Sequence, residues 1–231
     1  MTEDTFDKYI MEFKNVCSDE FCDEIVEWFE SDDCKKNTGL TGIGICHNLK
    51  QTTDVQLNIN MPHQKKLIHD IARILGEGKF RYIEMCNHKN LDRESSVTTP
   101  YNTPVGIIES FLISCVESIP QIQKYAKGDF FKWHTDYCGF DQRFLAYILY
   151  LNDVDSGGET VFISGKRVKP EKGKLLVFPT NINYVHKGEE LKKGTKYIIT
   201  SFSLVPRDYG SPEFQKSVFK VWVSIVIWYK A

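Results

Sequence analysis

The spacing of apolar positions changes along the chain, from helical in the first part to strand-like in the second. Residues 21–29 place apolar side chains three and four positions apart, as on one face of a helix, and Ser18 can cap that helix. A second helix is predicted over 64–75, where leucine and isoleucine form one stripe and Gly76 follows as a stop signal. The first part of the chain is therefore predicted to be helical.

From about Pro120 onward, short runs rich in Tyr, Phe, Val, Ile and Thr alternate with turn clusters that contain glycine. Many short strands separated by turn signals are typical of a β-sandwich or barrel. The run 144–151 is apolar at odd and even positions alike, which predicts a strand covered on both faces. We therefore predict an α+β fold, a double-stranded β-helix (jelly roll) with N-terminal supporting helices.

The length of 231 residues fits one elaborated domain with three parts. We expect residues 1–118 to supply the helical support and early strands, residues 119–205 the jelly-roll core, and residues 206–231 a C-terminal tail packed on the core. The tail carries the apolar run 218–229, which could form a strand or a helix. Lys220 interrupts this run, which is too short to span a bilayer.

Composition excludes several classes of protein. Hydrophobic residues make up 42% of the chain and the formal net charge is −2, so we expect a globular protein without a nucleic-acid partner. The seven cysteines form no C-x-x-C pair, which favours reduced thiols over a disulfide framework or a zinc knuckle. The acidic N-terminus lacks the apolar segment of a secretory signal. These features predict a cytoplasmic protein without a membrane partner.

The strongest chemical signal is the pair His134 and Asp136, two residues apart in a predicted strand. Side chains at that spacing point to the same face, so an imidazole and a carboxylate converge. With one distant histidine they would form a two-His-one-carboxylate triad, and His186 is the natural third ligand because it lies in a later predicted strand. The same donors could hold catalytic zinc, and a short H-x-D motif also occurs as a surface pair or a hydrogen-bonded core histidine.

A lysine in the next predicted strand adds to this signal. Lys196 follows His186 by ten residues. There its ammonium group could form a charge-assisted contact with a carboxylate of a bound diacid. The alternative is a solvated lysine beside Lys192 and Lys193.

Short sequence blocks before, between and after the candidate metal ligands occur in a defined order along the chain. The ordered blocks are Tyr125, His134-x-Asp136, Arg143, Tyr150-Leu151-Asn152, Gly157-Gly158-Glu159-Thr160 with Phe162, Pro170-x-x-Gly173, Phe178, His186, Gly194 and Lys196. In this order they resemble the catalytic jelly roll of 2-oxoglutarate- and iron-dependent oxygenases, of the prolyl 4-hydroxylase-like subgroup. The resemblance covers roughly residues 119–204 and assigns the two glycines to a tight turn.

The resemblance implies that His134, Asp136 and His186 hold Fe(II) and that Lys196 binds the distal carboxylate of 2-oxoglutarate. It implies a dioxygenase that couples oxidative decarboxylation of 2-oxoglutarate, to succinate and CO2, with hydroxylation of an aliphatic carbon. O2 is then the second co-substrate, and ascorbate is a candidate reductant. The carboxylate of Asp136 favours hydroxylation over halogenation, because halogenating relatives carry a small residue there. The prime substrate would be a peptide or a small molecule, with a peptidyl proline as the first candidate.

Four aromatic residues qualify the resemblance. Tyr125 and Tyr150 would line the 2-oxoglutarate pocket, although a core tyrosine with a satisfied hydroxyl explains each equally well. Phe131 stands where some relatives carry a second tyrosine, and Phe202 stands where tryptophan is common. Both phenylalanines keep an aromatic body without a polar group, which weakens any inference about the substrate.

Two other functions stay open beside the oxygenase. A jelly-roll binding module would keep the fold without turnover, and a zinc-dependent hydrolase would use the same three donors to activate water. The hairpin 165–174 carries five lysine and arginine residues. It could attract an acidic peptide or nucleic acid, but a solvated hairpin is the interpretation that we favour.

Overall fold

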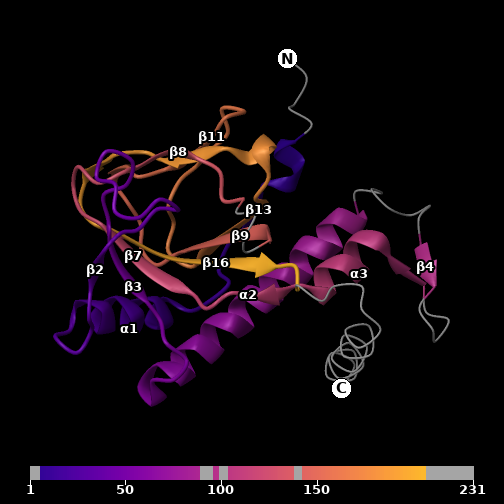
Figure 1. The fold of residues 1–231 in the computed structure, drawn as a ribbon, viewed down its shortest axis with the longest axis horizontal. Coiled ribbons are helices and arrows are strands. Elements are labelled where there is room, and N and C mark those ends of the chain that lie inside the picture. The colour runs from indigo at the N-terminus through magenta and orange to yellow at the C-terminus, as the bar shows by residue number, and fades with distance from the viewer. Residues whose placement is uncertain (1–5, 89–95, 99–103, 138–141, 207–231) are drawn as a thin grey trace.

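A computed structural model of the protein describes residues 6–88, 96–98, 104–137 and 142–206, which form three layers in Figure 1. A small sheet lies over a large sheet, and helices cover the opposite face of the large sheet (Figure 1). All described strand pairings are antiparallel. Two facing antiparallel sheets are the arrangement predicted from the many short strands.

The large sheet has eight strands and draws on both halves of the chain. Its order is β1 (Met11–Phe13), β13 (Lys174–Pro179), β9 (Arg143–Tyr150), β16 (Lys196–Leu204), β7 (Gln121–Tyr125), β3 (Thr53–Gln56) and β2 (Asn37–Thr38), with β6 (Val116–Glu117) also paired to β16. Residues from the first part of the chain thus form one end of this sheet, at β3 and β2, and the other end, at β1. The N-terminal part belongs to the same folded unit as the β-rich part.

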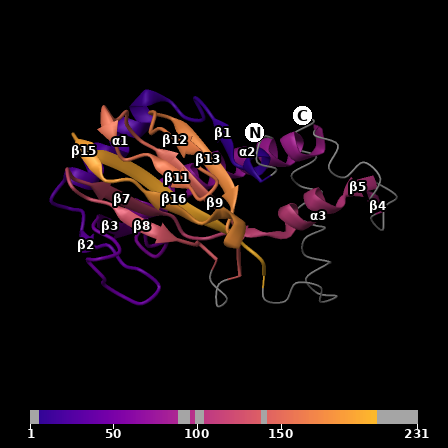
Figure 2. The same ribbon diagram turned by 90° about the horizontal axis from the view of Figure 1, so that it is seen from above.

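The small sheet has four strands and holds the residues with the strongest chemical signal. Its order is β12 (Arg167–Val168), β11 (Thr160–Phe162), β14 (His186–Gly188) and β8 (Phe131–His134). Figure 2 shows β11 and β12 stacked over β9 and β16 of the large sheet. Smaller elements complete the fold: β10 (Ser156–Gly157) with β15 (Leu191–Lys193), β4 (Ser96–Thr98) with β5 (Pro104–Gly106), and the 3-10 helices Asp7–Tyr9 and Ile182–Tyr184.

The strand β9 lies between two apolar cores, which explains why its sequence is apolar at odd and even positions from Phe144 onward. Leu145, Tyr147 and Leu149 join the core between the large sheet and the helices. The alternate residues Ala146, Ile148 and Tyr150 join the core between the two sheets. All six are buried, so the prediction of a strand covered on both faces is confirmed.

The first helix forms where the sequence predicts it. In α1 (Asp19–Glu30), Ser18 is the N-cap and its hydroxyl accepts a hydrogen bond from the Phe21 N–H at 3.2 Å. The helix buries Cys22, Ile25 and Phe29 in the core against the large sheet. Its amphipathic spacing therefore fixes which face meets the sheet.

The second helix is much longer than predicted. α2 runs from Pro62 to His88 and passes through Gly76, which the sequence suggested as a stop. Its stripe of apolar residues continues beyond that glycine to Tyr82 and Ile83, both buried in the core on the helical face of the large sheet. Packing on the sheet outweighs the weak helix propensity of glycine. A third helix, α3 (Ile107–Ser114), extends from one end of the sheets (Figures 1 and 2).

None of the described helices combines the length and the apolarity that crossing a membrane requires.

The six cysteines among the described residues are free thiols, and Cys138 lies outside them. From residue 207 onward, the predicted C-terminal tail also lies outside the described residues.

Two glycines of α2 test how closely the helix packs on the sheet. Gly76→Ala is expected to raise the free energy of unfolding by about 0.5–1 kcal/mol, because alanine favours the helix and nothing lies within 4 Å of the added Cβ. Gly78→Ala is expected to lower it, because the Cβ would lie 2.2 Å from Cδ2 of Leu175 on β13. Urea unfolding of the two variants measures the difference, and equal stabilisation by both would contradict this packing.

Candidate metal centre and its cavity

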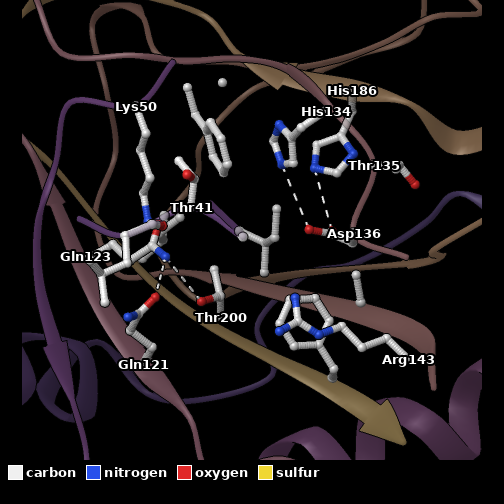
Figure 3. A pocket seen from close by; sticks show the side chains of 18 of the residues that line it. Thr41, Lys50, Gln121, Gln123, His134, Thr135, Asp136, Arg143, His186 and Thr200 are labelled. Carbon is white, nitrogen blue, oxygen red and sulfur yellow. Dashed lines mark hydrogen bonds and ion pairs between the residues drawn. The ribbon is translucent and has the colours of Figure 1, made fainter. Parts of the chain in front are cut away.

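Two neighbouring strands of the small sheet carry the two candidate histidine ligands. β8 and β14 pair antiparallel, and their register places His134 directly opposite His186. The sequence predicted that Asp136 lies in the same strand as His134. β8 ends at His134, however, so Asp136 lies just beyond the strand. The chain still turns the Asp136 carboxylate toward both imidazole rings (Figure 3).

The three side chains converge on one point. Nε2 of His134 lies 3.7 Å from Oδ1 of Asp136, and Nε2 of His186 lies 3.6 Å from Oδ2. One candidate ligand atom from each residue lies within 4.8 Å of the other two. Two imidazoles and one carboxylate at this spacing can share a metal ion and leave other coordination positions open. Within the described ranges, no second group of three His, Cys, Asp or Glu side chains comes together in this way.

Backbone carbonyls orient both imidazole rings. Nδ1 of His134 lies 2.7 Å from the carbonyl oxygen of Lys132, and Nδ1 of His186 lies 3.0 Å from that of Tyr184. A carbonyl only accepts hydrogen bonds, so each neutral ring carries its proton on Nδ1 and donates it. The lone pair of each Nε2 therefore points toward Asp136, as a metal ligand requires.

Thr180, which directly follows β13, binds the residues on both sides of Asp136. Its carbonyl oxygen accepts hydrogen bonds from the Thr135 hydroxyl at 2.8 Å and from the Tyr137 N–H at 3.0 Å. Its own hydroxyl donates to the Arg143 carbonyl at 2.7 Å. The backbone on both sides of Asp136 is thus held in place, although β8 ends two residues before it.

The environment of the centre keeps His134 neutral. Burial, together with the nearby His186, lowers the pKa of the His134 imidazole to about 4, against the opposing charge of Asp136. At neutral pH the ring is therefore unprotonated and available to a metal ion. His186 is buried and Asp136 is largely shielded from water.

The centre opens into a cavity of about 670 Å³ between the two sheets. Lys196 and Tyr125, neighbours in the β16–β7 register, lie in its wall. The Lys196 ammonium group donates to the Gly158 carbonyl at 2.9 Å and lies 3.8 Å from the centre of the Tyr125 ring. Burial lowers the pKa of Lys196 to about 7, despite the opposing charge of Glu159. The three candidate metal ligands and the buried Lys196 amine thus line the same cavity, and the partners of this amine are the Gly158 carbonyl and the Tyr125 ring.

A comparison with family models identifies the segment that builds this cavity. Residues 120–203 match the model of the 2OG-Fe(II) oxygenase superfamily. The match covers 84 of the 231 residues, and we refer to residues 120–203 as the oxygenase segment. It contains β7, β8, β9, β14 and β16, and so all the candidate site residues named above.

The comparison with curated proteins finds a probable prolyl 4-hydroxylase among the similar proteins. A segment of 53 residues is 47% identical to "Probable prolyl 4-hydroxylase 11" of Arabidopsis thaliana, over 23% of this chain and 18% of that protein. The matched segment therefore spans under a fifth of the relative's length.

Solved structures share the fold at low sequence identity. The viral collagen prolyl hydroxylase of Paramecium Bursaria Chlorella virus-1, in its 2OG complex, is 20% identical with a TM-score of 0.53, over 86% of this chain and 97% of that one. A prolyl hydroxylase of Trichoplax adhaerens, in complex with a hypoxia inducible factor peptide fragment, is 13% identical with a TM-score of 0.60, over 85% and 84%. Both similarities extend well beyond the oxygenase segment into the N-terminal part.

The two tyrosines of the predicted co-substrate pocket differ in their placement. Tyr125 lines the cavity and its hydroxyl donates to Oε1 of Gln123 at 3.2 Å. Tyr150 is fully buried behind the wall, and its hydroxyl lies 2.7 Å from Oγ1 of Thr160, which does line the cavity. The structure thus brings Tyr125 to the site directly and Tyr150 only through Thr160.

The paired glycines of the oxygenase segment lie at an irregularity of strand β10 and not in an assigned tight turn: Gly157 ends β10, where its pairing with β15 shifts register. Gly157 and Gly158 have φ of 78° and 72°, in the left-handed region that favours glycine. A Cβ on Gly157 would lie 2.2 Å from the Glu190 carbonyl oxygen. The Gly158 carbonyl accepts the hydrogen bond from Lys196.

The cavity has further polar residues that the sequence reasoning missed. Gln121 and Gln123 share the inward face of β7 with Tyr125, and Nε2 of Gln123 donates to Oε1 of Gln121 at 2.7 Å (Figure 3). The alternation in β7 was a usable signal, because residues two apart in a strand share a face. Lys50 enters from the N-terminal part, where the sequence carries no recognisable motif.

Most basic residues of the hairpin 165–174 are engaged in local contacts. Their partners are carboxylates or carbonyls: Lys166 with Ile10, Arg167 with Glu159 and Glu189, Lys172 with Asp23, and Lys174 with Glu12, Glu171 and Lys169. Such pairing supports the solvated hairpin over a surface that binds anions.

Metal binding tests the convergence of the three candidate ligands. The native protein is expected to bind one Co(II) ion, and His186→Ala to lose this binding, because only two donors would remain. Titration calorimetry of the two proteins measures the affinity. His69→Ala, which changes an exposed histidine on α2, serves as the matched control and should bind Co(II) like the native protein. Equal affinity in His186→Ala would contradict the assignment.

Proposed function

We propose that this protein is an Fe(II)- and 2-oxoglutarate-dependent dioxygenase that hydroxylates an aliphatic carbon. The observation that carries the proposal is the presence, in one cavity, of the His134, Asp136 and His186 donors and of the buried Lys196 amine. The donors suit a metal that needs open coordination positions, and the amine suits a carboxylate of the co-substrate. The match of residues 120–203 to the oxygenase superfamily model supports the same combination.

The three candidate ligands would hold Fe(II) on one face. Bound there, Fe(II) supplies the oxidative chemistry between 2-oxoglutarate, O2 and the substrate, which yields succinate, CO2 and a hydroxylated carbon. The chain's own residues orient the ligands: the Lys132 and Tyr184 carbonyls fix the imidazole tautomers, and Thr180 fixes the loop of Asp136. The two sheets limit the access of water to this chemistry.

Lys196 would bind the distal carboxylate of 2-oxoglutarate. Burial strips its amine of water, and its present partners, a carbonyl and an aromatic ring, compensate only in part for a buried charge. A carboxylate beside it would form a charge-assisted hydrogen bond in a shielded site. Tyr125 would pack against the same ligand, and Tyr150 would act through Thr160 rather than by direct contact.

A peptide is the substrate class that we favour, with a peptidyl proline as the first candidate. The support is the names of similar proteins, which include prolyl hydroxylases and one complex with a peptide fragment. The cavity rim adds to it, because Ile43, Trp133 and Tyr137 line the cavity and are 80%, 49% and 58% exposed. An exposed apolar rim of this kind suits apolar side chains of a polypeptide.

The remaining expectations extend this proposal to the whole chain. Residues 1–118 would support a core of residues 119–205, with α1 and α2 bracing the large sheet from outside. Free thiols at the six described cysteines support the expected cytoplasmic location. Ascorbate would serve as a reductant that keeps iron in the Fe(II) state.

The zinc-hydrolase and binding-module alternatives differ from this proposal in one measurable product. Protein given Fe(II), ascorbate and 2-oxoglutarate in air is expected to release succinate slowly even without a prime substrate. His134→Ala should abolish this release, because it removes a ligand, whereas His69→Ala should not. A zinc hydrolase or a binding module would release no succinate even as the native protein, and that result would overturn the proposal.

Removal of the Lys196 amine is expected to weaken 2-oxoglutarate binding. Lys196→Ala should lose about 1.5–3 kcal/mol of binding free energy, as for a hydrogen bond to a charged group. Calorimetry with Mn(II)-loaded protein measures the affinity without turnover. Lys193→Ala, at an exposed lysine paired with Asp155, is the control and should bind normally. An unchanged affinity in Lys196→Ala would exclude its role.

The lowered pKa of Lys196 also predicts a pH dependence. Above pH 7 the free protein loses the positive charge on Lys196, so 2-oxoglutarate must bind together with a proton and its apparent affinity falls. Below pH 7 the charge is already present and no proton is taken up. Calorimetry of Mn(II)-loaded protein in two buffers of different ionisation enthalpy counts the protons. Absence of proton uptake at pH 8.5 would contradict the prediction.

A further inference from the structure

The N-terminal part of the chain closes one side of the cavity by crossing from the small sheet to the large one. On the small-sheet side, the Lys132 N–H donates to the Leu49 carbonyl at 2.8 Å, and Lys50 forms a β-bridge with Phe131. A few residues later, β3 pairs with β7 of the large sheet, with Asp54 opposite Gln123. Residues 49–56 therefore link the strand of the ligand His134 to the opposite layer.

A buried ion pair spans this crossing. Nζ of Lys50 lies 2.7 Å from Oδ2 of Asp54, and both side chains are only 3% exposed. Lys50 lines the cavity in which the metal centre lies (Figure 3). Because withdrawing two charges from water costs about as much as their attraction returns, such a pair is poor evidence of added stability. The contribution of the pair is geometric, because it joins residues 50 and 54 across the two layers.

The lysine of this pair lies over a stack of rings that ends at a candidate metal ligand. Nζ of Lys50 is 5.3 Å from the centre of the Phe131 ring. That ring in turn stacks on the His134 imidazole, with centroids 3.5 Å apart and an angle of 12° between planes. The contact is face to face, so the plane of Phe131 sets the plane of His134. The Lys132 carbonyl restrains the same imidazole at Nδ1.

The backbone around the ion pair leaves it little room to rearrange. Gly39 lies so close that an added Cβ would be 2.0 Å from Oγ1 of Thr52, 3.0 Å from Cε of Lys50 and 3.1 Å from Oδ2 of Asp54. The Gly39 N–H also donates to the Thr52 carbonyl at 2.9 Å. The backbone at Gly39, directly after β2, is thus packed against the Lys50–Asp54 pair.

We infer that Lys50, fixed by Asp54, is a positioning residue for the candidate ligand His134 and acts on it through the Phe131 ring. The inference rests on the proposed role of His134 in metal binding. It gives the N-terminal part of the chain a direct part in the metal centre, beyond bracing the sheet. Loss of Lys50 would free the Phe131 ring and the end of β8, and His134 would sample orientations that do not point to the metal.

The test compares metal binding with thermal stability in Lys50→Met, which keeps most of the length of the side chain and removes its charge. Co(II) affinity is expected to fall about 10- to 100-fold, as for other residues that orient metal ligands. The visible absorption spectrum of bound Co(II) should change as well, because the geometry at His134 changes. Lys50→Arg keeps the charge and the ion pair and should restore both. The melting temperature is recorded for every variant.

Lys174 offers a matched control for the loss of a buried, ion-paired lysine. It is 2% exposed, pairs with Glu12 and Glu171, and does not line the cavity. Lys174→Met should lower the melting temperature but leave Co(II) affinity and the Co(II) spectrum unchanged. Equal Co(II) affinity in Lys50→Met, Lys174→Met and native protein would overturn the inference.

Two further variants keep the test decisive if Lys50→Met folds poorly. In the double variant Lys50→Met/Asp54→Leu no unpaired charge is left behind, so stability should recover while Co(II) affinity stays low. Phe131→Leu keeps the ion pair and removes the stacked ring, and it should lower Co(II) affinity in the same way. Native affinity in both variants would refute the inference. Failure of the native protein to bind Co(II) would instead refute the proposed function.

Discussion

The antiparallel pairing of β8 with β14 is the constraint on which the rest of the site depends. It places His134 opposite His186 on the inner face of the small sheet. A shift of one residue in this register would turn one of the two imidazoles out of the cavity, because side chains alternate between faces. The ties of Thr135 and Tyr137 to Thr180 then return the chain beyond β8 toward the two rings. The sheet thus supplies two donors directly and the third through a short braced loop.

Buried charge is the second theme of the cavity. Lys50 meets its carboxylate within the chain, whereas Lys196 meets a carbonyl and a ring. The first arrangement pairs two opposite charges within the chain and suits a fixed structural link between the layers. The second compensates its charge only in part, and the lowered pKa of Lys196 reflects this. In the proposed function, a ligand carboxylate would complete the second arrangement and offset the cost of burying the Lys196 amine.

The sequence predicted the elements whose signals are local. Strand spacing and ordered blocks led to His134, Asp136, His186 and Lys196, which the structure brings to one cavity although Asp136 lies beyond the end of β8. The capping serine located α1. The length of α2 was missed because its continuation past Gly76 depends on packing against the sheet and not on helix propensity. The role of Lys50 was invisible for a similar reason, since its partners Phe131 and Asp54 meet it only when residues 49–56 cross between sheets.

The most direct test of the account is a crystal structure of the iron-loaded protein with anomalous scattering measured at the iron edge. The account predicts a single strong peak between the two sheets, within bonding distance of Nε2 of His134, Nε2 of His186 and one carboxylate oxygen of Asp136. An iron peak elsewhere, or one bonded to fewer than these three residues, would contradict it.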